Sequence, residues 1–334
     1  MTPVDLLRPV CQGFRGIATN PANPSKTPLP LGGGHREARN SSPATPVKLC
    51  LMKLPRKICY IHAGLAKTGS TSIQKTLFEG SARSLLLENG VLYPSFNANH
   101  WRLASAFSGD NTDMAANRFM GASRTAAEDQ RALHCLAKEL DLHREKSAII
   151  SSEFFEQLRD QELSRLRDYL GQWFDRFLVI MYIREPADLA ASRVQEQVKN
   201  GVTTIEMLRN NPPVIDLIGI ITRLMNFFGK DAIIIRGFGQ QFFDEGGLLS
   251  DFLRAVGLDA VCIKTGKKPH NKSLTAFATL VADRLAAIRP ARTTLRPRQY
   301  QEHLVPVLSG FDGVPFRLPD FLEREVHRRT EEDV

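Results

Sequence analysis

The chain has 334 residues, of which 43% are hydrophobic and 24% charged, a composition typical of a globular protein. No apolar run reaches about 18 residues, so we expect no membrane-spanning helix. The formal net charge is +8, but residues 1–51, with six Lys/Arg against two Asp/Glu, carry +4 of it. The remaining charge requires no nucleic acid as a partner and is compatible with a site for a small, highly charged anion.

The first 55 residues differ from the rest of the chain. They hold nine of the 19 prolines and the run Gly32-Gly33-Gly34, without sustained periodicity, so we predict disorder. Two interpretations stay open. An over-extended start is favoured, because the folded pattern begins just after Met52; a mitochondrial-type presequence fits less well, because of Asp5 and the prolines. We therefore expect a disordered leader or an over-extended start at 1–55 and one α/β domain at 56–334.

The cysteines bear on the compartment and on metal binding. They are scattered and form no C-x-x-C pair: Cys11, Cys50, Cys59, Cys135 and Cys262. Such spacing favours free thiols in a reducing compartment, so we expect a cytoplasmic protein without a zinc site. No spacing of carboxylates and histidines indicates another metal.

From Lys57 onward, apolar runs alternate with helical patterns. Strands are predicted at 57–64, 147–153, 176–185 and 232–238, with a short extended piece at 91–94. Helices are predicted at 70–90, 125–143, 163–174, 186–201, 213–228 and 247–256, and again after Ser273. Strands separated by helices predict a parallel sheet covered on both faces, a three-layer α/β/α fold.

The first strand-to-helix junction carries the strongest signal. It reads "YIHAGLAKTGSTS" (60–72) and contains Gly64, Lys67 and Gly69. The side chains with hydroxyl groups around Gly69 are Thr68, Ser70, Thr71 and Ser72. Backbone N–H groups and the helix dipole favour an anion at such a junction. A Walker A loop places lysine directly after the second glycine, whereas Lys67 precedes Gly69. The simpler interpretation is a glycine turn in which Ser70 or Thr71 caps the helix.

"KTGSTS" resembles the 5′-phosphosulfate-binding loop of sulfotransferases that use 3′-phosphoadenosine 5′-phosphosulfate (PAPS). The second signature of that family, a strand-end arginine with a serine eight positions later that grips the 3′-phosphate, is matched by Arg184 and Ser192 in "IREPADLAAS". An arginine fork suits phosphate. The resemblance covers roughly Lys57 to Ser273. It implies a fold of the P-loop nucleotide-binding type, PAPS as sulfuryl donor and no metal.

The catalytic base is not given by a direct match. Aryl-type members carry a lysine-threonine-histidine strand end, whereas this chain has "SSE" ending in Glu153. Carbohydrate-directed members use a glutamate, which favours Glu153, although it could instead cap a helix or pair with Lys67 or Arg184. His100 is the competing base. The basic loop 264–273 either reaches the 3′-phosphate or is simply solvated.

We therefore predict a sulfotransferase that moves a sulfuryl group from PAPS to a hydroxyl or amine of a small molecule, glycan or lipid. Specificity is expected from residues 93–125 and 199–215, whose residue types fit sugars, lipids and small alcohols equally. The alternatives are a P-loop small-molecule kinase and a non-catalytic nucleotide-binding module. The displaced lysine, and the lack of a convincing strand-borne aspartate for Mg²⁺, count against the kinase.

Overall fold

The computed structural model of the chain describes Asp5 and residues 57–109, 117, 122–209, 211–258, 263, 273–288 and 304–332. The predicted leader, apart from Asp5, lies outside the described residues. So do residues 264–272 of the basic loop.

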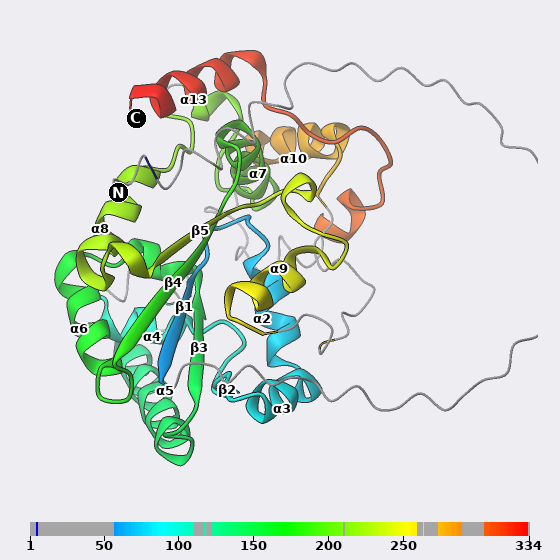
Figure 1. Cartoon of the computed structure of the whole chain (residues 1–334). Coiled ribbons are helices and arrows are strands. Elements are labelled where there is room, and N and C mark those ends of the chain that lie inside the picture. Colours follow the sequence, from blue (N-terminus) through cyan, green and yellow to red (C-terminus); the bar gives the residue numbers. More distant parts are fainter. Residues whose placement is uncertain are drawn as a thin grey trace, which may run out of the picture.

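The centre of the fold is a five-stranded sheet in the order β2-β3-β1-β4-β5 (Figure 1). The strands are β1 (Ile58–Ala63), β2 (Val91–Leu92), β3 (Ser147–Ser152), β4 (Arg176–Ile183) and β5 (Ile233–Gly237). Every neighbouring pair is parallel. The carboxyl ends of the strands therefore meet at one edge, where parallel sheets bind ligands. The predicted α/β/α class is confirmed.

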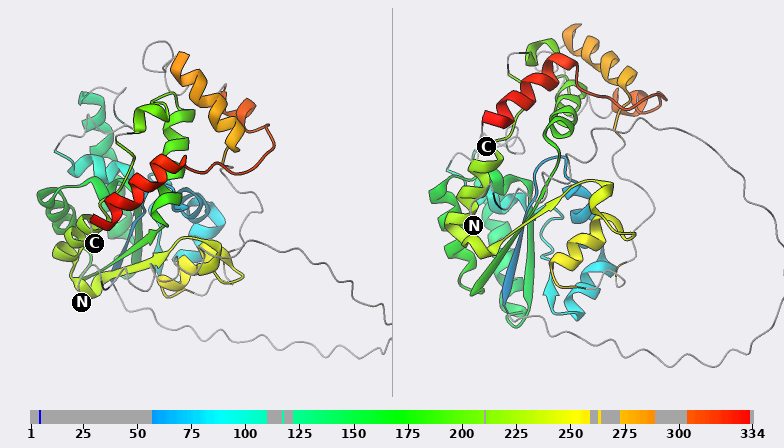
Figure 2. Two further views of the ribbon diagram at one scale, coloured as in Figure 1. Left: turned by 90° about the horizontal axis from the view of Figure 1, so that it is seen from above. Right: turned by 45° about the horizontal axis from the view of Figure 1, so that its top comes forward.

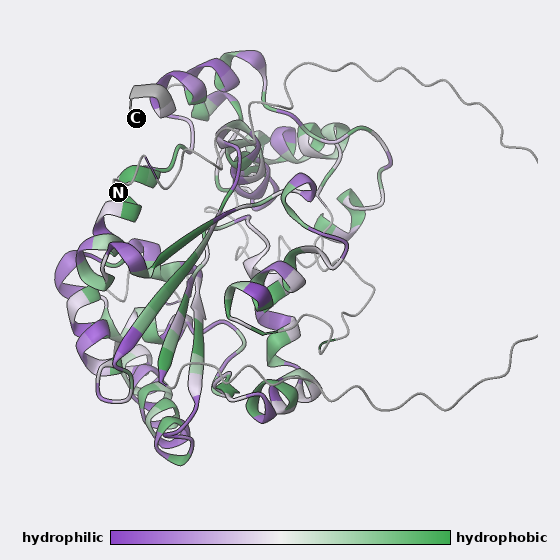
Figure 3. Ribbon diagram, in the orientation of Figure 1, coloured by the Kyte–Doolittle hydropathy of each residue, from purple (hydrophilic) through white to green (hydrophobic). Residues whose placement is uncertain are grey.

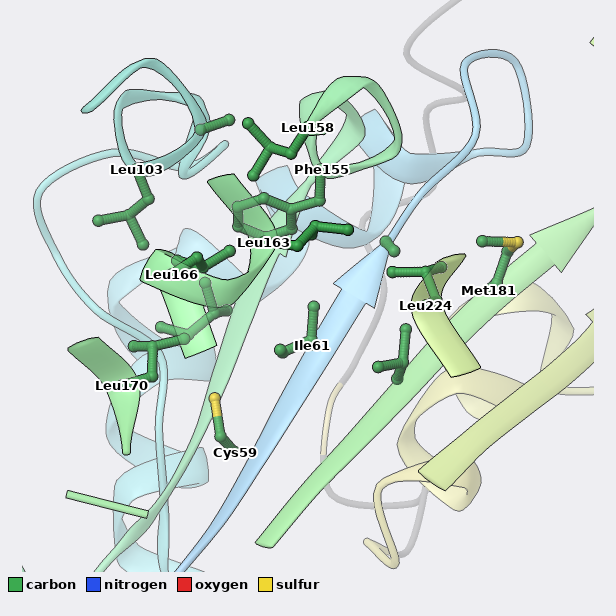
Figure 4. Packing of buried hydrophobic residues seen from close by; sticks show 14 of the residues in the cluster. Cys59, Ile61, Leu103, Phe155, Leu158, Leu163, Leu166, Leu170, Met181 and Leu224 are labelled. Carbon is green, nitrogen blue, oxygen red and sulfur yellow. The ribbon is translucent and has the colours of Figure 1, made fainter. Parts of the chain in front are cut away.

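Both faces of the sheet are covered, because successive side chains of a strand point to opposite sides. On one face Cys59, Ile61 and Met181 pack against α4 (Trp101–Phe107), α5 (Ala122–Leu142), α6 (Asp160–Leu170) and α8 (Leu217–Phe228), as Figure 4 shows for part of this cluster. On the other face Tyr60 and Tyr182 pack against α2 (Ser70–Phe78), α3 (Gly80–Glu88) and α9 (Gly247–Ala255). Figure 3 shows the hydrophobic strands between these two layers.

The helix predicted over 70–90 is wrong as one element. The chain leaves the helical conformation at Glu79, whose ψ is 138°, and restarts at Gly80 as α3. Glycine stabilises a helix interior poorly, so a break there costs little. The helix expected from 213 begins at Leu217, where Asp216 accepts a hydrogen bond from Gly219 N and caps it.

A third cluster of buried side chains lies beyond the carboxyl edge of the sheet. It joins α7 (Pro186–Lys199), α10 (Ala276–Ile288) and α13 (Asp320–Glu332), with Val194 and Leu322 fully buried in it. Figure 1 and the right view of Figure 2 show these helices beyond the strand ends. Gln195 ties α7 to the segment before α10 through two hydrogen bonds with the backbone of Leu274, and to α10 itself through Thr279. One side of α7 is thereby fixed to the cluster, and its other side faces the sheet.

Candidate functional site

The loop between β1 and α2 has a backbone that few residues adopt. Gly69, at the N-cap of α2, has φ +79°, and Lys67 also has a positive φ of 71°. A side chain at Gly69 would be strained at this φ, and its Cβ would overlap with Leu248 and Phe238. Glycine is therefore required at this position for steric reasons, and the loop packs closely against Leu248 and Phe238.

The hydroxyl groups of the loop divide into two sets. Thr68 and Ser70 are buried and donate to the carbonyl of Leu65, at 2.7 and 3.3 Å, so they brace the loop from inside. Ser72 is exposed and Thr71 is partly exposed. No side chain of the described residues caps α2 at Gly69, so the interpretation of Ser70 or Thr71 as the N-cap is wrong. The first N–H groups of the helix remain for an anion.

Lys67 does not project freely into solvent. Its Nζ lies 2.7 Å from Glu196 Oε2 on α7, and Lys199 Nζ approaches the same oxygen at 2.6 Å. Burial alone would raise the pKa of Glu196, but the two lysines outweigh it and lower the pKa to about 2. Glu196 therefore holds a negative charge where the loop would otherwise receive an anion.

Arg184 and Ser192 lie in contact with each other. Arg184 Nη1 donates to Ser192 Oγ at 3.4 Å, and its guanidinium lies 3.8 Å from Asp188. The guanidinium also faces the Phe238 ring at 5.8 Å from the centroid. Because Phe238 also lies against Gly69, its ring connects the loop of β1 with the arginine that follows β4.

Helix α7 gathers both halves of the site. Ser192 and Glu196 are one turn apart and so share a face of the helix. Ser192 contacts Arg184, and Glu196 contacts Lys67. Two cationic groups from different strand ends, β1 and β4, thus meet one helix surface. These strands are neighbours in the sheet, which places both groups at its carboxyl edge.

Glu153 begins a 3-10 helix, η1 (Glu153–Gln157), immediately after β3. Burial raises its pKa; the charge of Lys67 opposes the rise and that of Glu196 adds to it. Ser152, not Glu153, caps η1, and Lys67 pairs with Glu196. β3 neighbours β1 on the side opposite β4, so Glu153 stands beside the lysine loop. A half-buried carboxylate with a raised pKa next to a lysine is suited to accept a proton.

His100 has a different environment. It is fully buried, and its Nδ1 accepts a hydrogen bond from Ser151 N at 3.0 Å. Its Nε2 lies 3.2 Å from the carbonyl of Pro94, which can only accept, so Nε2 carries the proton and donates. Burial lowers the pKa of His100 to about 4. Both ring nitrogens are thus hydrogen-bonded to the backbone, so His100 is less available than Glu153 to accept a proton.

Glu156 was not predicted from the sequence as a site residue. It lies three residues after Glu153, and 3-10 geometry sets such residues on one face. Its carboxylate is 8% exposed, 3.7 Å from Arg193, and its Oε2 is buried without a hydrogen-bond partner in the described structure. Burial raises its pKa to about 7, with Glu153 adding to the rise while Arg193 and Arg223 oppose it. The "EFFE" spacing after a strand was the available signal.

A hollow of about 540 Å³ lies between α6 and α8, and its lining residues are Gly109, Arg159, Asp160, Gln161, Glu162, Arg165 and Arg223. Gly109 belongs to the segment 93–125 expected to set specificity, whereas none of the residues predicted to act in catalysis or donor binding lines the hollow. Its link to the site is Arg223, which donates to the carbonyl of Glu156 at 3.5 Å. It therefore lies beside the site and not within it.

The described residues hold neither a metal-binding cluster nor a membrane-spanning helix. No group of three or more His, Cys, Asp or Glu side chains among them could hold a metal ion. None of their helices is both long and apolar enough to cross a bilayer.

Comparison with known proteins gives limited likenesses. No family model matches the chain. An uncharacterized protein of Archaeoglobus fulgidus is 28% identical over 141 residues, which are 41% of this chain and 37% of that protein's length. A sulfotransferase from Alicyclobacillus acidocaldarius has 16% identity and a TM-score of 0.39, over 63% of this chain and 85% of that one. The sulfotransferase domain from the curacin biosynthetic pathway has 10% identity and a TM-score of 0.29, over 83% and 98%.

Proposed function

We propose that the protein is a PAPS-dependent sulfotransferase. One observation carries the proposal: α7 contacts two cationic groups. Its Glu196 pairs with Lys67 of the loop between β1 and α2 (residues 64–69), which we call the anion loop, and its Ser192 accepts a hydrogen bond from Arg184. PAPS has anionic groups at two ends, a 5′-phosphosulfate and a 3′-phosphate. Two separate cationic positions at one sheet edge suit such a donor better than a single phosphate site would.

In the proposed mechanism the residues bind, orient and take up a proton. The N–H groups of residues 69–71 and the Lys67 ammonium hold the phosphosulfate, while Arg184 and Ser192 hold the 3′-phosphate. PAPS supplies the sulfuryl group: the acceptor oxygen bonds to sulfur, and the bond from sulfur to the bridging oxygen breaks, leaving its electron pair on the phosphate. Lys67 stabilises that charge, and Glu153 takes the proton of the acceptor hydroxyl.

Lys67 has to exchange partners for this to happen. In the structure its charge is compensated by Glu196, which Lys199 also contacts. When a phosphosulfate occupies the loop, Lys199 can retain Glu196 while Lys67 turns to the ligand. Glu196 would thus keep the empty loop electrically balanced.

We further propose a cytoplasmic location and an acceptor with a free hydroxyl. The location is supported by the scattered cysteines and by the free thiols of Cys59 and Cys135. A hydroxyl acceptor fits the half-buried Glu153, which can accept a proton beside the lysine loop.

The function is tested by ligand-induced stabilisation. Adenosine 3′,5′-bisphosphate without Mg²⁺ should raise the melting temperature, whereas selective stabilisation by Mg²⁺-ATP would favour the kinase. Transfer of label from PAPS to pooled sugars, phenols and lipid head groups then separates an enzyme from a binding module. Absence of both bisphosphate binding and transfer would overturn the proposal.

Single variants assign the two anion positions. Lys67→Ala should abolish transfer with the fold intact. Arg184→Ala should weaken adenosine 3′,5′-bisphosphate by about tenfold or more, the loss of one charge-assisted hydrogen-bonded contact, but barely affect adenosine 5′-phosphosulfate, which lacks the 3′-phosphate. Arg209→Ala is the matched control, because this exposed arginine pairs with Glu206. Equal losses for both ligands would make Arg184 merely structural.

A further inference from the structure

Helix α10 packs with its small side chains inward and its large ones outward. Ala278, Thr279, Ala282 and Ala286 are its buried residues. Phe277, Leu280 and Ile288, at spacings of three, eight and eleven residues, are 57%, 54% and 77% exposed. A surface helix normally buries its large apolar residues, and one that is apolar all round is normally covered on every side. The outer face of α10 therefore has the chemistry of an interface.

The segment after residue 304 extends this face. The Phe311 ring meets Phe277 with 5.2 Å between centroids, and Ala276 N donates to Val314 O at 2.8 Å. Val307 and Val314 are also largely exposed. We call the six side chains Phe277, Leu280, Ile288, Val307, Phe311 and Val314 the α10 face. Figures 1 and 2 show α10, in orange, on the outside of the molecule with α7 between it and the sheet.

The area of the α10 face is large for a free surface. Scaling the accessible area of each side chain by its exposed fraction gives on the order of 600 Å² of apolar surface, at the upper limit for monomers. A stable dimer buries about 800 Å² from each partner, much of it apolar with a polar rim. The six side chains with their polar neighbours match that requirement.

The charges on the α10 face complement each other. Arg284 stands on the exposed side of α10, four residues before Ile288 and four after Leu280, and Asp312 lies between Phe311 and Val314 in sequence. Neither takes part in an ion pair within the part of the chain that the structure describes. In a two-fold symmetric contact a pair formed by two different residues occurs twice, once on each side of the axis, so one cation and one anion per chain suffice for two ion pairs. A membrane surface would instead favour cations alone around the apolar patch.

We propose that the α10 face is the interface of a homodimer, in which the faces of two copies pack against each other about a two-fold axis. The sheet edge with Lys67 and Arg184 lies on the other side of α7, so each copy keeps its own site.

Light scattering after gel filtration tests the proposal with the full chain between about 5 and 100 μM, where stable dimers with low-micromolar dissociation constants persist. The expected mass is twice 37.3 kDa. Ile288→Asp and Leu280→Glu should each reduce it to the monomer mass. Leu142→Asp is the matched control, because Leu142 is 75% exposed at the end of α5 and should leave the dimer unchanged.

Charge exchange tests the symmetry. Arg284→Asp and Asp312→Arg should each weaken the dimer about tenfold, and the double variant should recover most of the loss, because the exchanged charges meet again across the axis. A monomeric wild type at 100 μM, or a dimer insensitive to both Ile288→Asp and Leu280→Glu, would overturn the proposal. So would a monomer that binds anionic phosphatidylserine vesicles through these same residues.

Discussion

Replacement of Glu196 by glutamine separates stability from ligand binding at the site. Glu196 Oε2 accepts from Lys67 at 2.7 Å and from Lys199 at 2.6 Å. The variant keeps a hydrogen-bond acceptor of similar size but removes the charge, so two lysines face each other uncompensated. We expect the fold to become less stable and the empty loop to become a stronger anion site.

The magnitude follows from the pKa of Glu196, which the lysines depress to about 2 from an ordinary value of 4.5. A depression of this size corresponds to roughly 3 kcal/mol of folding free energy. Because the side chains of the Lys67–Glu196 pair are 30% and 31% exposed, we discount it to about 1–2 kcal/mol. In the wild type a ligand must break the Lys67–Glu196 pair and lose this 1–2 kcal/mol, whereas in the variant it does not. Adenosine 3′,5′-bisphosphate should therefore bind the variant roughly 5- to 30-fold more tightly.

Urea unfolding at several pH values and titration calorimetry measure the two effects. The contribution of Glu196 to the free energy of unfolding is fully present above pH 4.5 and is lost as the pH falls toward about 2, because its folded-state pKa is depressed. The difference between wild type and variant should therefore shrink on acidification. Glu206→Gln, at an exposed pair with Arg209, is the control. Weaker bisphosphate binding by Glu196→Gln would refute the reasoning and make Glu196 a support that positions Lys67.

Three further variants test the site. Glu153→Gln should lower kcat by about 100-fold or more with donor affinity nearly unchanged, whereas His100→Asn should lower the urea midpoint and leave the pH dependence of transfer unaltered; the reverse pattern would make His100 the base. Glu156→Gln should flatten the pH dependence of the melting temperature between pH 5 and 8. The pKa of Glu156 is raised from 4.5 to about 7, so wild-type stability declines as the pH rises from 4.5 to about 7; an equally steep decline in the variant would assign it to another group. Gly69→Ala should lower the free energy of unfolding by about 1–2 kcal/mol for the left-handed backbone alone, and it should impair bisphosphate binding. Gly80→Ala, whose Cβ meets nothing within 4 Å, should leave both unchanged. Equal effects of the two variants would exclude a special role for Gly69.

Local signals in the sequence were sufficient for much of the fold. The strands β1, β3, β4 and β5 stand out as short apolar runs, and Pro186 marks the first position of α7. The order of the strands was not predictable, because β1 pairs with segments about 90 and 120 residues away. The break at Glu79 was missed because the helical pattern runs through it, and a single Gly80 is a weak signal.

The candidate site shows the same division. Lys67, Arg184 and Ser192 belong to short patterns, and the structure places each beside an ion or hydroxyl partner. Glu196 was not predicted, because 129 residues separate it from Lys67 and it belongs to no pattern near the loop. The available signal was its position one helical turn after Ser192. Phe238 gave no signal, because an aromatic residue after a strand is usually core. Which side of α10 is buried was equally hidden, since both sides are apolar.

The place of β1 in the sheet has a consequence for how the loop opens. Its backbone is hydrogen-bonded on both sides, to β3 and to β4, and all six of its residues are buried. Such a strand exchanges its amide hydrogens only when the whole fold unfolds, whereas edge strands such as β2 open locally. The N-terminal end of the anion loop is therefore attached to the slowest-exchanging segment we expect in the chain. Ligand binding can reorient Lys67 and its neighbours, while β1 keeps its position. Little of that change is therefore transmitted to the amino-terminal ends of the strands.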